Sequence, residues 1–454
     1  MTPLTPHSPP PTPMSRLSRV LVAIALVSAT PLHAQRSGGV AAEVDAAYAK
    51  GEALYIDLHK APELSFHESA TATRIATELR TLGFDVTTGV GGTGVVGVLK
   101  NGAGPTVLLR TELDALPVTE ATGLPFASTV RTKDDNGLDV GVMHACGHDL
   151  HMAAVVSTAR IMAGDRSRWH GTLVVIGQPA EERLGGARAM IADGLLTRFP
   201  RPDFVIAVHD DPRYPSGTIG YHAGPILSNS EGITIRIFGR GGHGARPETT
   251  VDPVVIAART VLALQTIISR EISPFDPAVI TVGAIHGGTK RNIIPDEVRL
   301  DLTVRSFTEP VRLHLRSAIE RVAKAEAAAA AAPKEPSFEL AETAYALVND
   351  SALTQRISTM LLRELGPTRV RDMPPESASE DLSEFPRAGI PTLMLRVGAT
   401  EPAVYEKAMR DGAILPSLHN AAFRPDLQPA LKSAILAELL TLRELMPVAR
   451  AATR

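Results

Sequence analysis

From about residue 43 onward the chain alternates between two hydrophobic patterns. Stretches with helical periodicity, such as 42–59 and 69–82, alternate with short β-branched runs such as 106–110 and 172–177. This alternation is typical of an α/β layer with a mainly parallel sheet. The β-branched runs lead into loops rich in titratable residues, and open α/β sheets bind ligands at the carboxyl ends of their strands. We therefore predict an α/β fold with a functional site at that edge.

The pattern changes between residues 227 and 340, a segment called the insert below. It predicts a strand at 232–238, a helix at 252–270, two further strands and a helix from residue 311. An alanine-rich run is expected to end this last helix at Pro333, because Ala favours helix and Pro stops it. The two further strands are expected near 278–285 and 297–305. This order indicates a smaller α+β, βαββαβ-like domain that interrupts a first domain formed by 43–226 and 341–447.

Composition narrows the class of protein. With 454 residues, 44% hydrophobic and 21% charged, the chain is typical of a folded protein of two or three domains. The 46 Lys and Arg against 49 Asp and Glu give a net charge of −3, which argues against a polybasic nucleic-acid binder. Cys146 is the only cysteine, so its thiol is left for packing, metal binding or nucleophilic chemistry.

Residues 1–34 are typical of a secretory signal peptide, with Met14 as the expected start. Basic residues precede the apolar run 20–27, and Ala34 ends a small-residue cleavage site. The run is much shorter than the roughly 20 residues that span a bilayer. We expect a soluble exported protein, periplasmic or secreted, with no stable membrane span. An uncleaved anchor, or a Pro-rich tail with a short helix, is the alternative.

Residues 143–151 hold three histidines, one cysteine and one aspartate. Thiolate and imidazole ligands favour a transition metal such as zinc over magnesium or calcium. Gly147 permits a tight backbone path that lets Cys146 and His148 meet at one ion. The alternatives are a purely structural cluster and a Cys/His hydrolase, which needs a free thiolate. We favour a metal site.

Further acids and histidines follow other predicted strands. Glu181 and Glu182 come after the run 172–177, and two adjacent glutamates can divide the work, one binding a metal and the other taking a proton from water. His209 ends another β-branched run, and His419 lies near the end of the chain. Taken alone, the glutamate pair is more typical of surface charge, and each histidine is more typical of a capping or core residue. Only the combination indicates a site.

Two more blocks carry candidate chemistry. Glu112 and Asp114 alternate after the strand at 106–110, and such a carboxylate commonly orients a metal-bound histidine. A surface Arg/Asp pair is the alternative. His243 lies among glycines at 239–245, without the strand-to-helix context of a phosphate loop. A glycine-rich turn with an exposed histidine is the alternative there.

Together these blocks resemble the aminoacylase and carboxypeptidase family of co-catalytic metallopeptidases. The similarity is greatest to its amidohydrolase branch, which includes hippurate hydrolases, N-acyl-amino-acid hydrolases and plant auxin-conjugate hydrolases. It extends over about residues 45–445, with the blocks in family order. The matching blocks are 59–65, 110–117, 144–151, 178–187, 241–245, 287–296, 379–383 and 418–420.

The resemblance implies a site for two divalent cations, with Zn or Mn expected and Co or Ni also suited to these ligands. Glu181 would be the general base, taking a proton from a water acidified by both ions and returning it to the leaving amine. The implied metal ligands are Cys146, as a thiolate shared by both ions, His148, Glu182, His209 and His419. Asp114 would support this set from behind.

The resemblance also implies that the insert is a lid through which the protein forms a homodimer. His243 matches a residue that stabilises the oxyanion, often in the partner subunit's site, while Asn292 and Arg305 match positions that hold the substrate. The implied function is hydrolysis of N-acyl amino acids or related small amides. A metallo-dipeptidase or carboxypeptidase of the same fold is one alternative. A binding protein without metal is the other, although it would be expected to lack a ligand or the base.

Two departures from the family pattern bear on the site. Glu112 stands where the family more often has Asp, so its role is open. Asp210 and Asp211 follow His209 and add negative charge near the site. We hypothesise that they disfavour anionic acyl groups, and faster turnover of succinyl than of acetyl amino acids would count against this.

Overall fold

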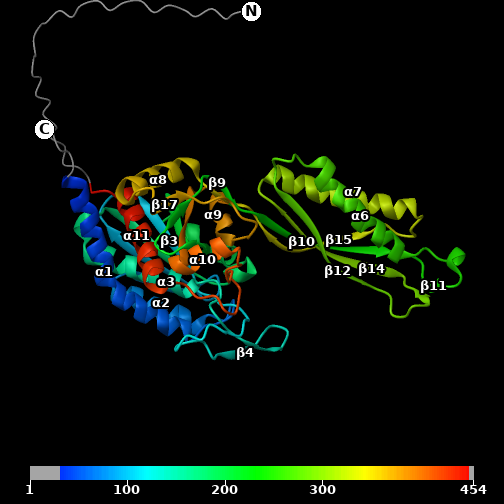
Figure 1. Cartoon of the computed structure of the whole chain (residues 1–454), viewed down its shortest axis with the longest axis horizontal. Helices are drawn as coiled ribbons and strands as arrows, with labels where there is room; N and C mark the ends of the chain where they lie inside the picture. The colour runs from blue at the N-terminus through cyan, green and yellow to red at the C-terminus, as the bar shows by residue number, and fades with distance from the viewer. Residues whose placement is uncertain (1–30, 449–454) are drawn as a thin grey trace, which may run out of the picture.

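An eight-stranded sheet forms the centre of the larger part of the molecule, called the main domain here (Figure 1). The strand order is β1-β2-β6-β3-β7-β18-β8-β17 in this computed structural model, which describes residues 31–448. Its central strands β6, β3, β7 and β18 are parallel, as predicted, while β1 and β2 are antiparallel additions. The strands are β1 (Asp85–Val90), β2 (Gly94–Asn101), β3 (Thr106–Glu112), β6 (Gly171–Gln178), β7 (Phe204–Pro215), β8 (Ile219–Tyr221), β17 (Val370–Asp372) and β18 (Thr392–Thr400).

Helices cover both faces of this sheet. The larger apolar core lies under α1, α2, α3, α8 and α11, and a second core lies on the other face under α4, α5 and α9. Helix α3 is buried over most of its length, because it packs against both α1 and α11. The helices are α1 (Pro31–His59), α2 (Ser69–Thr81), α3 (His148–Gly164), α4 (Gly186–Ala192), α5 (Leu195–Arg198), α8 (Ser351–Leu365), α9 (Glu384–Arg387), α10 (Pro402–Asp411) and α11 (Leu427–Leu445).

The insert forms a separate four-stranded antiparallel sheet of order β12-β14-β10-β15. Two helices pack on one face of it around an apolar core. The predicted βαββαβ order is therefore confirmed. The elements are β10 (Asn229–Phe238), α6 (Pro253–Glu271), β12 (Ala278–Gly287), β14 (Glu297–Ser306), α7 (Glu309–Ala329) and β15 (Ser337–Ala344). At its far end the short strands β11 (Gly242–His243) and β13 (Ile293–Ile294) pair (Figure 1).

The insert extends further along the chain than predicted. The expected boundary at residue 340 falls inside β15, whose Ala344 pairs with Ser230 of β10. The physical reason is that β15 alternates small, apolar and charged residues, so its hydrophobic pattern is weak. The chain enters and leaves the insert beside a small antiparallel pair, β9 (Gly224–Leu227) with β16 (Leu347–Asn349).

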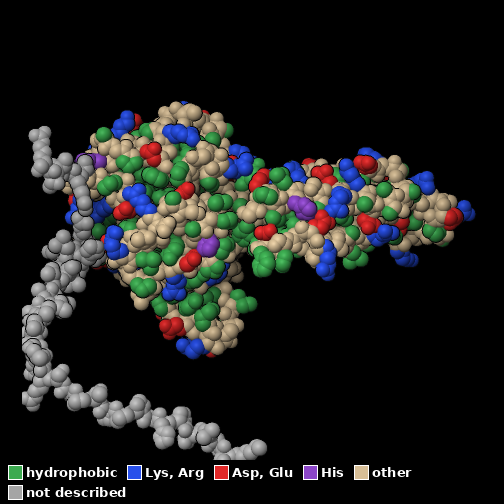
Figure 2. Space-filling view, turned by 90° about the horizontal axis from the view of Figure 1, so that it is seen from above, with side chains coloured by type: hydrophobic (Ala, Val, Ile, Leu, Met, Phe, Trp, Pro, Cys, Tyr) green, Lys and Arg blue, Asp and Glu red, His purple; other side chains and the backbone are tan. Residues whose placement is uncertain are grey.

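Helix α6 is the one helix within residues 31–448 that is long and apolar enough to cross a membrane. Here it lies on the insert's sheet with Ile256, Leu264 and Ile267 buried, so it is a core helix of that domain. Its outer face still carries exposed Val255 and Leu262. Figure 2 shows apolar atoms interspersed with charged groups along the whole insert.

The predicted signal peptide lies outside the described residues, apart from residues 31–34. These four begin helix α1, so the expected cleavage site at Ala34 falls within that helix.

Candidate metal centre

The candidate ligands come from four places in the main domain that meet at the carboxyl edge of the sheet. Cys146 precedes α3 and His148 begins it, Glu182 follows β6, and His209 lies on β7. His419 belongs to the loop before α11. Gly147 has a φ of 76°, a left-handed conformation that glycine adopts without cost, and it turns the chain from the Cys146 loop into α3.

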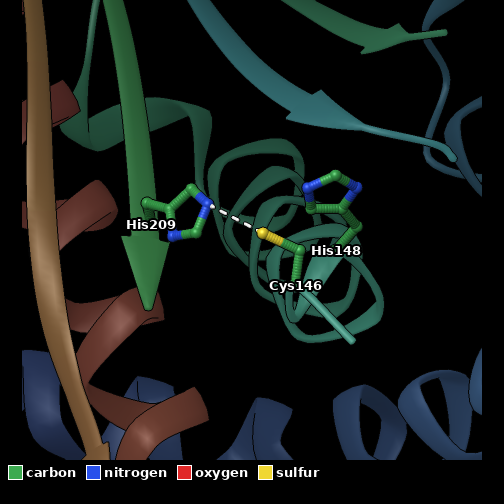
Figure 3. A group of neighbouring side chains, drawn as sticks. All are labelled: Cys146, His148 and His209. Carbon is green, nitrogen blue, oxygen red and sulfur yellow. Dashed lines mark hydrogen bonds between the residues drawn. The ribbon is translucent and has the colours of Figure 1, made fainter. Parts of the chain in front are cut away.

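The thiol of Cys146 lies at the centre of the cluster. Its Sγ is 3.3 Å from His419 Nε2 and 3.7 Å from His209 Nε2. In Figure 3 the rings of His148 and His209 lie on either side of the thiol. Glu182 Oε2 is 3.4 Å from His419 Nε2, and its Oε1 is 4.0 Å from His148 Nε2. All five predicted ligands are therefore brought together.

The five side chains divide into two groups of three that share the thiol. One group is Cys146, His148 and His209, and the other is Cys146, Glu182 and His419. Within each group the candidate ligand atoms lie within 4.8 Å of one another. A sulfur common to both groups is the arrangement that a thiolate between two cations requires.

The chemistry of these atoms fits metal binding. Among the described residues, His148 Nε2 and Glu182 Oε1 are buried and lack a hydrogen-bond partner. Such an unpaired buried atom costs about 1–3 kcal/mol, so it is expected to bind something. Burial raises the pKa of the Cys146 thiol well above its usual range, and the Glu182 and Glu181 carboxylates add to this. Cations at this point would satisfy the orphaned atoms and favour the thiolate.

Asp114 organises the cluster from behind, as predicted for its position. Its carboxylate accepts hydrogen bonds from the backbone N–H groups of Glu181 (3.1 Å) and Glu182 (3.0 Å) and from Ser65 Oγ (2.6 Å). Its backbone oxygen is 2.8 Å from His148 Nδ1. This contact leaves His148 Nε2 facing the other ligands.

Glu181, the predicted base, is buried beside the ligands, with its Oε2 3.8 Å from His148 Nε2. Burial raises its pKa well above the usual range, and the nearby Glu380 and Glu182 carboxylates raise it further. The segment that carries it is bounded by Ala180 and Leu184, both with positive φ. Non-glycine residues adopt this conformation at a cost of about 1 kcal/mol or more, and such strain is concentrated at functional sites.

His419 is held in a similarly unfavourable backbone conformation, with a φ of 64°. Its backbone N–H donates to the carbonyl of Ala145 at 2.8 Å, which ties this late loop to the residue before Cys146. The side chain is 54% exposed, so His419 closes the cluster on its solvent side.

A buried charged network beneath the cluster was not predicted in detail. Arg110 binds Glu112 and donates to Glu380 at 2.7 Å and Asp381 at 3.2 Å. Glu112 also lies 3.0 Å from His151 Nδ1. The open role of Glu112 is therefore structural support that joins Arg110 to the helix of His148. The block 379–383 was noted in the sequence, but nothing in its pattern indicated Arg110 as its partner.

His151 and His144 differ from the ligands of the same motif. His151 Nε2 lies 3.0 Å from Asp210 Oδ1, so this ring is fixed between two carboxylates. His144 is buried with neither ring nitrogen bonded within residues 31–448. Burial lowers the pKa of His144 to about 4, so it is a neutral core histidine.

The two acids after His209 are both paired with basic side chains. The hypothesis that their negative charge disfavours anionic acyl groups therefore loses its premise. Asp210 contacts His151, and Asp211 binds Arg213 through both carboxylate oxygens at 2.9 and 2.6 Å. Arg213 is only two residues from Asp211, whereas Arg396, which also meets Asp211, is distant in the chain and could not be assigned to it from the sequence.

Four of the five candidate ligands, Cys146, Glu182, His209 and His419, line a cavity of about 620 Å³, and so does Glu181. Arg305 of the insert also lines it, and its Nη1 donates to Ser379 Oγ at 3.0 Å. His243 and Asn292 do not reach this cavity. They lie together at the β11–β13 tip, where the Gly244 N–H donates to the Asn292 carbonyl at 2.9 Å, at the end of the insert far from the main domain (Figure 1).

Comparison with known proteins agrees with this geometry. Residues 108–413 match the model of peptidase family M20/M25/M40. The chain is 37% identical to thermostable carboxypeptidase 2 of Saccharolobus solfataricus, with 72% of this chain and 80% of that protein covered. It is 38% identical to the hippurate hydrolase of Campylobacter jejuni, with 60% of this chain and 68% of that protein covered.

A solved structure is also similar. A dinuclear metal-binding peptidase of Bacillus subtilis matches with a TM-score of 0.71 and 29% identity, over 87% of this chain and 98% of that one. The predicted resemblance, the α/β fold class and the assignment as an enzyme that cleaves amide bonds are confirmed. The chain belongs to peptidase family M20/M25/M40.

Proposed function

We propose that this enzyme hydrolyses N-acyl amino acids or related small amides with two divalent cations per chain. The observation that carries the proposal is one cavity in which Glu181 lies beside two ligand groups that share the Cys146 thiol. The similarity to a hippurate hydrolase supports an acylated amino acid as substrate.

The ions would be held by Cys146, His148 and His209 on one side and by Cys146, Glu182 and His419 on the other. Divalent cations in such a site supply Lewis acidity to a water molecule and to the substrate's carbonyl oxygen. Zn or Mn is expected, and Co or Ni also suits sulfur, nitrogen and carboxylate ligands.

The protein's own residues then move the proton. Glu181 takes it from the attacking water and delivers it to the nitrogen of the leaving amine, so one carboxylate serves as base and then as acid. The bonds from Asp114 fix the backbone of Glu181 and Glu182, which keeps the base in place while the neighbouring residue binds metal. Arg305 faces the same cavity and is suited to the substrate's carboxylate.

We further propose a homodimer joined through the insert, because His243 and Asn292 lie away from the cavity of their own chain. The outer face of α6 and the edge strand β12 present exposed apolar residues along the insert, including Leu262 (72% exposed), Val255, Val279 and Ile285. An edge strand with free backbone groups pairs readily with another chain. A second copy packed there would bring its His243 to the first copy's cavity, where it would stabilise the oxyanion.

Sedimentation of Leu262→Asp tests the dimer. A buried charge at the interface is expected to convert dimer to monomer at micromolar concentration. The matched control is Leu138→Asp. Leu138 is also exposed (62%), but it lies in the main domain, in the hairpin formed by β4 (Arg131–Lys133) and β5 (Asp139–Gly141). A wild-type chain that is monomeric at all concentrations would refute the proposal.

A carboxypeptidase or dipeptidase of the same fold is the second candidate. The similarity to thermostable carboxypeptidase 2 favours it. The deciding experiment measures metal content of the purified protein, then amine release from N-acyl amino acids and from dipeptides, with added Mn or Zn. Faster cleavage of acyl amino acids supports the first function, and faster cleavage of dipeptides supports the second. Failure to bind metal under any reconstitution would exclude both.

Export is also a proposal, carried by the sequence of residues 1–34 alone. N-terminal sequencing of protein recovered outside the cytoplasm is expected to begin at Gln35. A chain that retains Met14 and stays in the cytoplasm would contradict it.

A further inference from the structure

The cavity has a charged wall that the proposed mechanism does not use. Asp211, Arg213, Glu376 and Arg396 all line it and form a closed ring of ion pairs, called the ion-pair ring below. Arg213 binds both oxygens of Asp211, and its Nη1 lies 3.0 Å from Glu376 Oε2. Arg396 Nη1 completes the ring at 3.5 Å from both Asp211 Oδ2 and Glu376 Oε1.

The ring lies next to the reacting centre. Asp211 and Arg213 follow His209 at alternate positions on β7, so the three side chains share one face of the strand. Residues two apart on a strand are separated by about 7 Å. Arg396 is the register partner of His209 in the β7–β18 ladder. A substituent a few atoms beyond the scissile carbonyl therefore reaches the ring.

The four charges of the ring sum to zero, but its side chains differ in their exposure to solvent. Asp211 and Arg396 are buried, with side chains 3% and 5% exposed, whereas Arg213 and Glu376 are 45% and 30% exposed. Of the five N–H groups of a guanidinium, Arg213 uses three within the ring. It therefore pairs with both acids, with Arg396 as the second positive charge, and still offers donors to a ligand.

We propose that the ion-pair ring sets the charge preference for the acyl group and that Arg213 is its specificity-determining residue. The substrate class then includes amino acids whose acyl chain ends in a carboxylate, such as N-succinyl amino acids. This inference rests on the proposed function. Without Arg213, Asp211 and Glu376 would face the substrate with only Arg396 to balance them.

The test compares kcat/KM for the N-succinyl and N-acetyl forms of one amino acid. In Arg213→Gln the succinyl-to-acetyl ratio is expected to fall about tenfold, because one unit of charge is removed several ångströms from the carboxylate. In Glu376→Gln the ratio is expected to rise, and in the double variant it returns towards wild type. The control Arg168→Gln, at a half-exposed ion pair outside the cavity, leaves the ratio unchanged.

If the ring had a purely structural role, each single variant would turn over both substrates more slowly. The succinyl-to-acetyl ratio would then not change in opposite directions in the two variants. An unchanged ratio in both variants, or movement in the same direction, would overturn the inference. If Arg213→Gln fails to fold or to bind metal, the direction of change in Glu376→Gln decides. Absence of any acyl-amino-acid turnover by the metal-loaded wild type would instead refute the proposed function.

Discussion

The main domain and the insert present their functional side chains in opposite ways. In the main domain Cys146, His148 and Glu181 are buried, and Asp114 bonds both the His148 ring and the backbone of Glu181. In the insert His243 lies exposed on a two-residue strand and does not line the cavity that holds the candidate ligands. One region therefore carries a nearly complete candidate site, whereas the other carries residues that lie away from it and that would act only in the proposed dimer.

The strongest test of the main domain is Glu181→Gln. We expect kcat to fall about a thousandfold, because general base catalysis of this kind contributes about 10²- to 10⁴-fold. Metal content should stay at the wild-type level, since Glu182 supplies the ligand group. Turnover is measured by amine release and metal by elemental analysis. Wild-type kcat in this variant would remove Glu181 as the base.

For the insert, His243→Ala should lower kcat about a hundredfold through loss of one oxyanion donor. Mixing this variant with Glu181→Gln under subunit exchange should recover activity. Half of the dimers then contain one chain of each variant, and each such dimer has one intact site out of two. About a quarter of wild-type activity is therefore expected. The unmixed variants are the controls. Recovery that does not exceed their sum would place His243 outside the partner's site.

Asp114→Asn tests how the main domain holds its ligands. The amide keeps the shape of the carboxylate but cannot accept at both positions from the Glu181 and Glu182 N–H groups. Metal affinity or activity should fall about 10- to 100-fold, as for other groups that orient metal ligands. Competition with a chelator measures the affinity. Asp203→Asn, at a comparable backbone bond outside the cavity, is the control and should leave affinity unchanged.

The smallest effect concerns the buried support behind the site. Burial raises the pKa of Glu438 on α11 to about 8, and its Oε2 accepts from Thr158 at 2.5 Å. Between the unfolded value of 4.5 and this pKa, the folded state binds more protons than the unfolded state. The contribution of Glu438 to the free energy of unfolding is therefore fully present below pH 4.5 and is lost as the pH rises through about 8.

Glu438→Gln removes this titration. At pH 8 the variant should be more stable than wild type by on the order of 2 kcal/mol, and at pH 5 the difference should nearly vanish. Urea unfolding at both pH values measures it. Glu444→Gln, on the same helix but partly exposed, controls for general effects of lost charge. A difference that does not depend on pH would mean that Glu438 is ionised in the folded protein.

Much of the architecture followed from the sequence, because hydrophobic periodicity is a local signal. The helices near 42–59 and 69–82 and the order of elements in the insert were predicted and are present. The strand β15 was missed as part of the insert, since its alternation is weak and its place depends on pairing with β10. The candidate metal ligands were proposed from the sequence because some of them, such as Glu182 and His209, follow or end predicted strands and because the blocks together resemble a known family.

The sequence by itself determined which groups could bind metal and act as base. The amino acids available as thiol, imidazole and carboxylate ligands are fixed by the chain, and their positions after predicted strands do not depend on distant contacts. Tertiary structure decided their partners. It divided five ligands into two groups around one sulfur, assigned Glu112 to Arg110, and neutralised Asp211 with Arg213 and Arg396. The physical reason is that charge compensation in a buried site is set by distances in space, which positions along the chain do not reveal.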